Sequence, residues 1–224
     1  MNQLGVFLKA PVAGAVKTRL GQALGMEEAA AVYRAFCGDL AETLASLEST
    51  NLWVFYSPAT ALESCQTLFA GAAPEAVEWR WRPQSDGDLG DRMRVALEEL
   101  LGHGGPAALV GTDLPTLTCE ACAAAFRALE RVPVVFGPAK DGGYYLIGLT
   151  RMVSGLFTDI AWSTSAVLDQ SLAQLRRDGC ASELLACERD VDTLEDLRVL
   201  SRQLKEARGG IAPRTRRACE ELGV

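Results

Sequence analysis

Short apolar runs alternate with helical stretches along almost the whole of this 224-residue chain. The runs typical of buried strands lie at residues 4–8, 52–56, 77–82, 108–110, 132–138 and 145–149. The stretches typical of helices lie at residues 26–47, 61–69, 92–101, 118–130, 166–177 and 193–205. This order predicts an α/β fold, in which a mainly parallel sheet is the middle layer of a three-layer α/β/α sandwich.

No internal repeat, low-complexity tract or linker interrupts the pattern, so we expect one domain across residues 1–224. The last stretch, residues 211–224, is predicted to be a terminal helix that packs on this domain. The formal net charge of −7 argues against a general binder of nucleic acid or anionic membranes. There is no run of 18 apolar residues to span a membrane, and no basic region precedes the first apolar run as in a signal peptide.

The segment Ala108-Leu-Val-Gly-Thr-Asp-Leu-Pro115 ends one predicted strand and carries an aspartate just beyond it. Gly111 lets the backbone turn and Pro115 prevents the strand from continuing, so Asp113 follows the carboxyl end of the strand. Ligands of open α/β sheets bind at that edge. On this segment alone, two interpretations have equal weight. In the first, Asp113 holds a divalent metal against nucleotide phosphates; in the second, it caps the following helix or makes an Asx turn.

The loop after the first predicted strand concentrates basic residues in an acidic protein. Lys9, Lys17 and Arg19 flank Gly14, and a flexible loop in this place can surround phosphates with backbone N–H groups. The basic side chains would neutralise the phosphate charge. The alternative is an exposed basic turn. A Walker A loop is rejected because the residue immediately before Lys17 is Val16 and not glycine.

Two further polar segments precede predicted helices. Residues 84–93 contain Gly87, Asp88, Gly90 and Arg92, and Asp91 is predicted to be the N-cap of the helix that follows. This segment either contacts a base or phosphate or is a surface turn rich in turn-forming residues. In the other segment, Ser163 or Thr164 is predicted to cap the helix at residues 166–177, where an anion could bind.

Asp141, Gly142 and Gly143 form a strong hairpin signal before Tyr144. The same turn, with its charge and adjacent aromatic residues, also suits an acceptor or sugar pocket. Both interpretations place it at the end of a strand.

Asp190 and Asp192 flank Val191, so in an extended segment their side chains share one face. Two neighbouring carboxylates repel, and a cation between them relieves that repulsion. Mg²⁺ (or Mn²⁺) takes one or two protein carboxylates and completes its shell with phosphates and water. Asp113, Asp190 and Asp192 would meet that need. Thr193 is predicted to begin a helix with Asp196 as its capping-box partner.

The seven cysteines and the single histidine carry weaker signals. An odd number of cysteines in a large domain fits a reduced, cytoplasmic protein. Cys119 and Cys122 form a C-x-x-C, but they lie in an Ala-rich helical pattern with no second pair at zinc-finger spacing, which favours helix packing over zinc or redox chemistry. His103 lies between glycines at a predicted loop tip, where a catalytic role is not favoured.

Six elements together resemble the GT-A fold of the nucleotide-diphospho-sugar transferase superfamily. The closer resemblance is to its DUF2064 branch of glycosyltransferase-like bacterial proteins, which is related to 2-phospho-lactate guanylyltransferases and molybdenum-cofactor nucleotidyltransferases. The elements occur in the expected order over nearly the whole chain: Lys9-Ala-Pro with Gly14 and Lys17-Thr-Arg-Leu20, Gly87-Asp-Leu-Gly-Asp-Arg-Met93, Gly111-Thr-Asp-Leu-Pro115, Asp141-Gly-Gly-Tyr-Tyr145, Trp162-Ser-Thr164 and Asp190-Val-Asp-Thr193.

The resemblance implies roles for these positions. Asp113 would match the metal-binding aspartate of the fold, and Asp190 with Asp192 would match the second metal-binding pair of the guanylyltransferases. Lys17 and Arg19 would hold the diphosphate or triphosphate, with Lys9, Gly14 and Thr112 around it. Residues 87–93 would lie near the base, and residues 141–145 with 163–165 near the second substrate. One departure stands out: Ala10-Pro11 and Val12-Ala13 replace the glycine pair of the usual G-G-x-G-x-R loop.

We therefore expect a Mg²⁺-dependent transferase that acts on a nucleotide and a small phosphorylated or hydroxylated acceptor. Its reaction is either nucleotidyl transfer from an NTP or glycosyl transfer from an NDP-sugar, and the Asp190–Asp192 pair favours the first. The altered first loop motivates an alternative, a module that binds a nucleotide without turnover. The base, the acceptor and the oligomeric state are not specified by the sequence.

Overall fold

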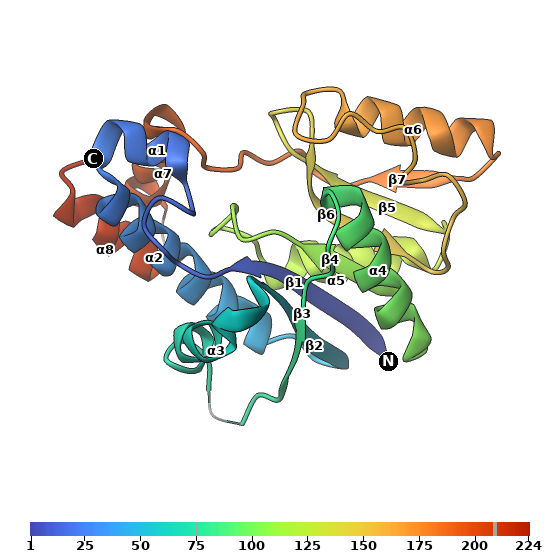
Figure 1. The fold of residues 1–224 in the computed structure, drawn as a ribbon, viewed down its shortest axis with the longest axis horizontal. Coiled ribbons are helices and arrows are strands. Elements are labelled where there is room, and N and C mark those ends of the chain that lie inside the picture. Colours follow the sequence, from blue (N-terminus) through green and yellow to red (C-terminus); the bar gives the residue numbers. More distant parts are fainter. Residues whose placement is uncertain (75, 208–209) are drawn as a thin grey trace.

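The computed structural model describes residues 1–74, 76–207 and 210–224, and the seven strands found there form one sheet in the order β3-β2-β1-β4-β6-β5-β7 (Figure 1). Only β6 runs antiparallel to its neighbours, β4 and β5, while the other paired strands are parallel. The mainly parallel sheet predicted from the sequence is therefore confirmed. The strands are β1 (Asn2–Lys9), β2 (Thr50–Ser57), β3 (Trp79–Pro83), β4 (Ala107–Val110), β5 (Val134–Pro138), β6 (Tyr144–Leu149) and β7 (Ser182–Leu184).

The register around β1 creates the crevice in which a ligand can bind. β1 pairs with β2 on one side, as far as Lys9 opposite Ser57, and with β4 on the other, as far as Val6 opposite Val110. The chain thus adds β2 and β3 on one side of β1 and then returns to add β4 on the other side. Strand order reverses at this point, and the loops after β1 and β4 separate at the carboxyl edge.

Helices cover both faces of the sheet, as the three-layer prediction requires (Figure 1). On one face the buried side chains of the sheet pack against α2 (Met26–Ala45), α3 (Leu62–Ala70) and α5 (Cys119–Leu129). On the other face they pack against α4 (Leu89–Gly102) and α6 (Val167–Arg177). We propose that residues 1–224 form one domain, because a single sheet takes strands from both halves of the chain. No helix in the described segments is long and apolar enough to cross a membrane.

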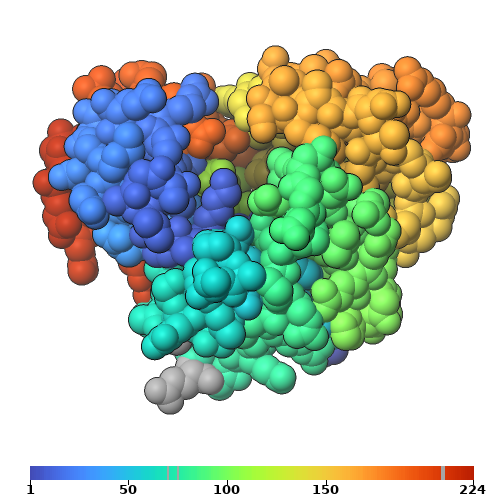
Figure 2. All heavy atoms as spheres, in the orientation of Figure 1, coloured from blue at the N-terminus to red at the C-terminus, as the bar shows by residue number. Residues whose placement is uncertain are grey.

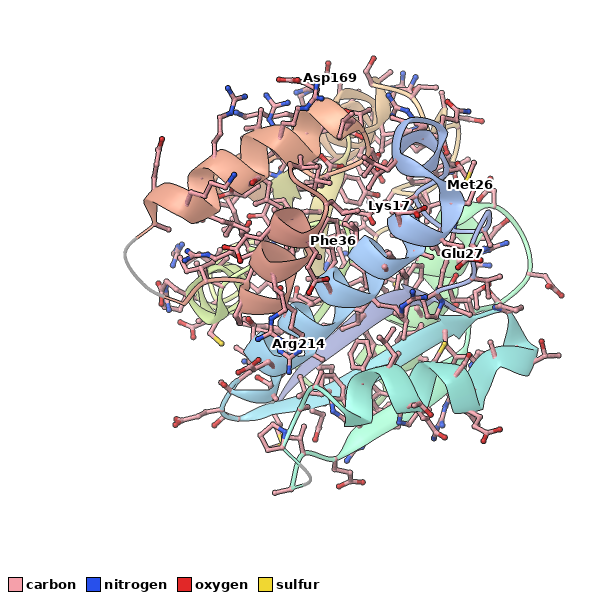
Figure 3. All side chains as sticks on the ribbon, turned by 90° about the vertical axis from the view of Figure 1, so that its left-hand side faces the viewer. Lys17, Met26, Glu27, Phe36, Asp169 and Arg214 are labelled. Atoms are coloured by element: carbon pink, nitrogen blue, oxygen red, sulfur yellow. The ribbon has the colours of Figure 1, made fainter. Side chains whose placement is uncertain are left out.

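A smaller third core lies on the outer side of α2, against α1 (Thr18–Leu24), α7 (Leu194–Glu206) and α8 (Pro213–Glu221). Figure 3 labels Phe36 of α2 and Arg214 of α8 on the side where these helices meet. The buried carboxylate of Asp39 accepts hydrogen bonds from the N–H groups of Arg214, at 3.0 Å, and Thr215, at 2.8 Å. α2 therefore supplies the N-terminal cap of α8, and the predicted packing of the terminal helix is confirmed.

Local predictions at three turns have different outcomes. The Asp-Gly-Gly turn joins the antiparallel strands β5 and β6, as the hairpin signal predicted. Thr193 and Asp196 form the predicted capping box of α7. The prediction for α4 was wrong: the helix begins at Leu89, and Asp88 is the N-cap, with its carboxylate accepting the Asp91 N–H at 2.9 Å. Asp88 has the extended backbone that a capping residue needs, whereas Asp91 is already helical.

The predicted cap of α6 was also wrong. The helix begins at Val167 with Ala166 as N-cap and no side-chain cap bond. Thr164 instead donates its hydroxyl to the carbonyl of Ala161, at 2.7 Å, within its own turn. The sequence pattern also missed the short elements α1 and β7.

Candidate active site

A cleft of about 1140 Å³ opens at the sheet edge where β1 and β4 end. Its walls are the loop after β1, the start of α4, the β5–β6 turn, residues 162–165, and the segment that carries Asp190 and Asp192. Figure 2 shows the hollow between the blue N-terminal part, the green α4 and the yellow-to-orange segments. The cleft thus collects the polar segments that the sequence places after separate strands.

Lys17 lies at the floor of this cleft with its side chain only 3% exposed. Its ammonium group is 2.6 Å from Asp113 Oδ1 and 2.9 Å from Asp192 Oδ1. The residue is the N-cap of α1 and has a left-handed backbone, with φ 46°, which is uncommon for a side chain of this size. One buried cation therefore joins two carboxylates from distant parts of the chain.

The electrostatics of Lys17 follow from that arrangement. Burial opposes its positive charge, but attraction to Asp113 and Asp192 outweighs burial and leaves the pKa of the ammonium above its usual 10.5. Lys17 is therefore a permanent cation at neutral pH. Figure 3 labels its position near the start of α1.

The carboxylates of the cleft crowd one another. Burial raises the pKa of Asp190 to about 6, and the negative charges of Asp141, Asp192 and Asp113 add to the shift. Arg19, whose side chain is 69% exposed, approaches Asp192 Oδ2 at 4.0 Å. The floor of the cleft therefore has more negative charge than Lys17 alone offsets.

Backbone and side-chain hydrogen bonds hold the strand ends together beneath the cleft. The N–H of Val191 donates to the carbonyl of Asp113 at 3.0 Å, which fixes the segment between Asp190 and Asp192 against the end of β4. The hydroxyl of Tyr33, on α2, lies 3.0 Å from Thr112 Oγ1 and accepts the N–H of Lys9 at 3.1 Å. Tyr33 thereby links the ends of β1 and β4.

The sequence pattern predicts Tyr33 only as part of the helix at residues 26–47. Its hydroxyl reaches the cleft because of how α2 packs on the sheet, and no local signal indicates that packing. Trp162, in the same cleft, was quoted only as part of a motif.

The carboxylates of the cleft have the chemistry of ligands for a divalent metal. Asp113, Asp190 and Asp192 offer the hard oxygen ligands that Mg²⁺ prefers, and their mutual repulsion favours a cation. Within residues 1–74, 76–207 and 210–224, no three His, Cys, Asp or Glu side chains converge closely enough to hold a metal by themselves. The donor set therefore fits an ion that takes one or two carboxylates here and its other ligands from a bound phosphate and water.

Most residues predicted to bind substrate line this cleft. Those that do are Lys9, Lys17, Arg19, Gly87, Asp88, Arg92, Thr112, Asp113, Asp141, Gly143, Tyr144, Ser163, Thr164, Asp190 and Asp192. Three predicted glycines are not part of the lining. Gly90 packs beneath the Trp162 ring and Gly142 packs beneath the Ser165 carbonyl, where a Cβ would collide in both cases. Gly14 has a positive φ of 77° and open space around it.

The weaker candidates lie away from this chemistry. Cys119 donates its thiol to the Thr43 carbonyl, and burial raises the pKa of Cys122 to about 12, so both thiols are packed and protonated. His103 packs against Trp53 with ring centroids 4.4 Å apart and the rings tilted by 41°. Packing therefore explains these residues.

The fold and the cleft define the class of the protein as that of the nucleotide-diphospho-sugar transferases. A protein from Desulfovibrio desulfuricans G20, provisionally described as a nucleotide-diphospho-sugar transferase, is 32% identical, with a TM-score of 0.86 over 99% of this chain and 96% of that chain. The chain belongs to the DUF2064 family, whose model, described as "Uncharacterized protein conserved in bacteria", matches residues 40–164. Its similarity to the Desulfovibrio protein identifies it as a transferase.

More distant solved structures share the fold alone. The 4-diphosphocytidyl-2C-methyl-D-erythritol synthase of Anaerococcus prevotii is 9% identical, with a TM-score of 0.61 over 91% of this chain and 96% of that chain. A cytidylyltransferase of Leptospira borgpetersenii is 9% identical, with a TM-score of 0.57 over 98% of this chain and 94% of that chain. No protein of curated function matches the sequence.

Proposed function

We propose that the protein is a metal-dependent nucleotidyltransferase, which binds an NTP with Mg²⁺ (or Mn²⁺) and transfers the nucleotidyl group to a small acceptor with release of pyrophosphate. The observation that carries the proposal is the buried Lys17 ammonium between Asp113 and Asp192 at the floor of the cleft. A cation and carboxylates at the strand-order reversal are a suitable set of groups for binding a polyphosphate with its metal.

The charge balance supports a metal. Four basic and five acidic side chains line the cleft, so it is formally one charge negative before a substrate enters. A triphosphate would add several more negative charges to this partly buried space. A divalent cation held by Asp113, Asp190 and Asp192 would offset them, and when bound it would polarise the phosphates and stabilise the leaving pyrophosphate.

The chain's own residues would then do three things. Lys17, with Arg19 and Lys9 at the rim, would bind the phosphates beyond the bond that breaks and neutralise the negative charge that develops there. Tyr33 would keep the ends of β1 and β4, and so the two sides of the phosphate site, in register. The walls of the cleft would hold the acceptor next to the α-phosphorus.

The proposed step is a direct displacement. An acceptor oxygen forms a bond to the α-phosphorus while the bond from that phosphorus to the bridging oxygen breaks, and the electron pair leaves with pyrophosphate. When the acceptor is a hydroxyl, its proton passes to water in the open cleft. The described residues that line the cleft include no cysteine or histidine, which fits a route without a covalent enzyme intermediate.

Calorimetric titration of NTPs tests the proposal. We expect Asp113→Asn to weaken the binding of the best Mg²⁺–NTP by about tenfold or more, because it removes a charged ligand from the phosphate site. The matched control is Asp169→Asn, an exposed residue on α6 that does not line the cleft (Figure 3). Equal affinities for the wild type in Mg²⁺ and in chelator would contradict the metal-bridged model.

A further inference from the structure

Part of the cleft lining is apolar and belongs to the face of the sheet that α4 covers. It includes the apolar side chains of Phe7, Leu89, Met93, Tyr144, Ile147 and Trp162, which come from β1, α4, β6 and the segment before α6. Leu89, the first residue of α4, is 43% exposed. We call these six residues the apolar wall.

The apolar wall is held rigidly. The ring of Trp162 rests on the backbone of Gly90, where a Cβ would lie 2.5 Å from the indole, and stacks on Phe157 at 6.4 Å. The loop that carries Trp162 is fixed by two hydrogen bonds of 2.7 Å, from the Ala161 N–H to Gln170 and from the Thr164 hydroxyl to the Ala161 carbonyl. The indole is therefore presented to the cleft in one place before any ligand binds.

The phenol of Tyr144 adds its ring rather than its hydroxyl to this wall. The hydroxyl is turned inward, 3.8 Å from the sulfur of Met93, and burial raises the pKa of Tyr144 well above its usual value of 10. The ring packs against Phe136 with centroids 5.0 Å apart. Tyr144 thus contributes an aromatic surface, and polar contacts on this side come from other residues.

The charged groups beside the apolar wall do not suit an anion. The charged residues that line the cleft on the same segments as the apolar wall are Asp88 and Arg92, at the start of α4, and Asp141, in the turn before β6. Their net charge is −1. Arg92 already donates its Nε–H to the Gly87 carbonyl at 3.1 Å. A phosphate bound here would lose hydrating water against an apolar surface. It would also lie near the two carboxylates of Asp88 and Asp141, and the one cation nearby, Arg92, already has a hydrogen-bond partner.

The size of the cleft leaves room for a second ligand. Pockets of about 300–1,000 Å³ hold one drug-sized molecule. The cleft measures about 1140 Å³ and continues from the phosphate floor to the apolar wall. An occupant of the apolar wall would therefore lie next to the reacting phosphate of a nucleotide on the floor.

We propose that the apolar wall is the acceptor subsite and that it selects an uncharged, hydroxylated acceptor with an apolar or ring-shaped face, rather than a phosphorylated one. The inference rests on the proposed function, since the acceptor hydroxyl is the group that attacks the nucleotide. The ring face packs on Trp162, and the hydroxyls meet Ser163 and Asp141 at the boundary with the floor. Leu89, at the start of α4, would be shared with the base that the resemblance places near residues 87–93. An anionic acceptor is excluded by the carboxylates of the same side.

A matched pair of probes tests this selection. Phenyl β-D-glucoside and its 6-phosphate differ only in the anionic group, and their binding is measured by saturation-transfer NMR titration. We expect the neutral glucoside to bind about tenfold more tightly than its phosphate. We expect Trp162→Ala to weaken the glucoside by about tenfold, and the control Leu184→Ala, an exposed residue outside the cleft, to leave it unchanged.

Separate nucleotide titrations keep the two proposals apart. Trp162→Ala should leave the affinity for Mg²⁺–NTP within about twofold of the wild type, because the indole is not part of the phosphate floor. Three results would overturn the acceptor subsite: the phosphorylated probe binds as tightly as the neutral one, the neutral probe does not bind, or Trp162→Ala leaves the affinity for the glucoside unchanged. Failure of the wild type to bind any NTP refutes the proposed function instead.

Discussion

Replacing Lys17 by methionine removes the buried cation while keeping most of the volume of the side chain. Breaking a buried ion pair by deleting one partner typically costs about 3–5 kcal/mol. The side chains of Asp113 and Asp192 are 49% and 38% exposed, so water can rehydrate them, and we reduce the expected cost to about 2–3 kcal/mol. For a chain of this length that loss lowers the Tm by about 5–10 °C.

The same change should increase affinity for the metal. Under the proposed function, Mg²⁺ would compete in the wild type with the Lys17 ammonium, which is paired with the carboxylates of Asp113 and Asp192. Without the ammonium, two neighbouring negative charges remain uncompensated. We therefore expect nucleotide-free Lys17→Met to bind Mg²⁺ about tenfold more tightly than the wild type, and its lost Tm to be partly restored by Mg²⁺. Mg²⁺–NTP should bind the variant more weakly, because a phosphate contact is lost.

Titration calorimetry with Mg²⁺ alone and differential scanning calorimetry measure both effects. Arg19→Met is the matched control, since Arg19 is exposed and 4.0 Å from Asp192, and we expect it to change Mg²⁺ affinity and Tm only slightly. If Lys17→Met bound Mg²⁺ no more tightly than the wild type and kept the wild-type Tm, the reasoning about the buried ammonium would be refuted.

Three further substitutions probe the supports of the site. Tyr33→Phe removes the hydroxyl that joins Lys9 to Thr112. It should lower the free energy of unfolding in urea by about 1–2 kcal/mol and weaken Mg²⁺–NTP binding in calorimetry. No change in either quantity would contradict the linking role. Gly90→Ala should lower the stability of the protein in urea, because the added Cβ would collide with Trp162. Alanine is normally favoured over glycine in helices by about 1 kcal/mol, so a gain in stability would show that the ring does not pack there. Asp39→Ala should cost about 2–3 kcal/mol and speed amide hydrogen exchange in α8, with Asp39→Asn milder; unchanged exchange would rule out the cap.

The sheet and its main helices were predictable because their signals are local. Strands such as β2 are continuous apolar runs, and helices such as α2 show apolar residues at helical spacing over many turns. The elements that the sequence missed derive their structure from distant partners. β7 has three residues and forms a strand because Ser182 to Leu184 pair with β5, and α1 is a polar helix of seven residues whose Leu20 is buried in the third core.

Many of the residues that line the cleft were also predictable from the sequence. Asp113 follows the carboxyl end of a predicted strand, and Asp190 and Asp192 were grouped with it because carboxylates that repel one another suit a divalent cation. The contact between Lys17 and Asp192 spans 175 residues and depends on a left-handed backbone at Lys17, which no sequence rule indicated. The hydroxyl of Tyr33 reached the site in the same non-local way.

Gly90 and Gly142 have a packing role that the sequence did not indicate. The resemblance implies that both lie near a substrate, and that expectation stays a prediction. The structure places each beneath another wall of the cleft, Trp162 and Ser165 respectively. A Cβ at either position would collide with part of the protein itself, so packing alone requires glycine there.

Product analysis of a panel of NTPs and NDP-sugars, each with Mg²⁺ and a neutral hydroxylated acceptor, distinguishes nucleotidyl transfer from glycosyl transfer. We expect one NTP to give pyrophosphate and a nucleotidylated acceptor in equal amounts, and we expect chelator to abolish both. Release of nucleoside diphosphate from an NDP-sugar, or turnover that continues in chelator, would contradict metal-dependent nucleotidyl transfer.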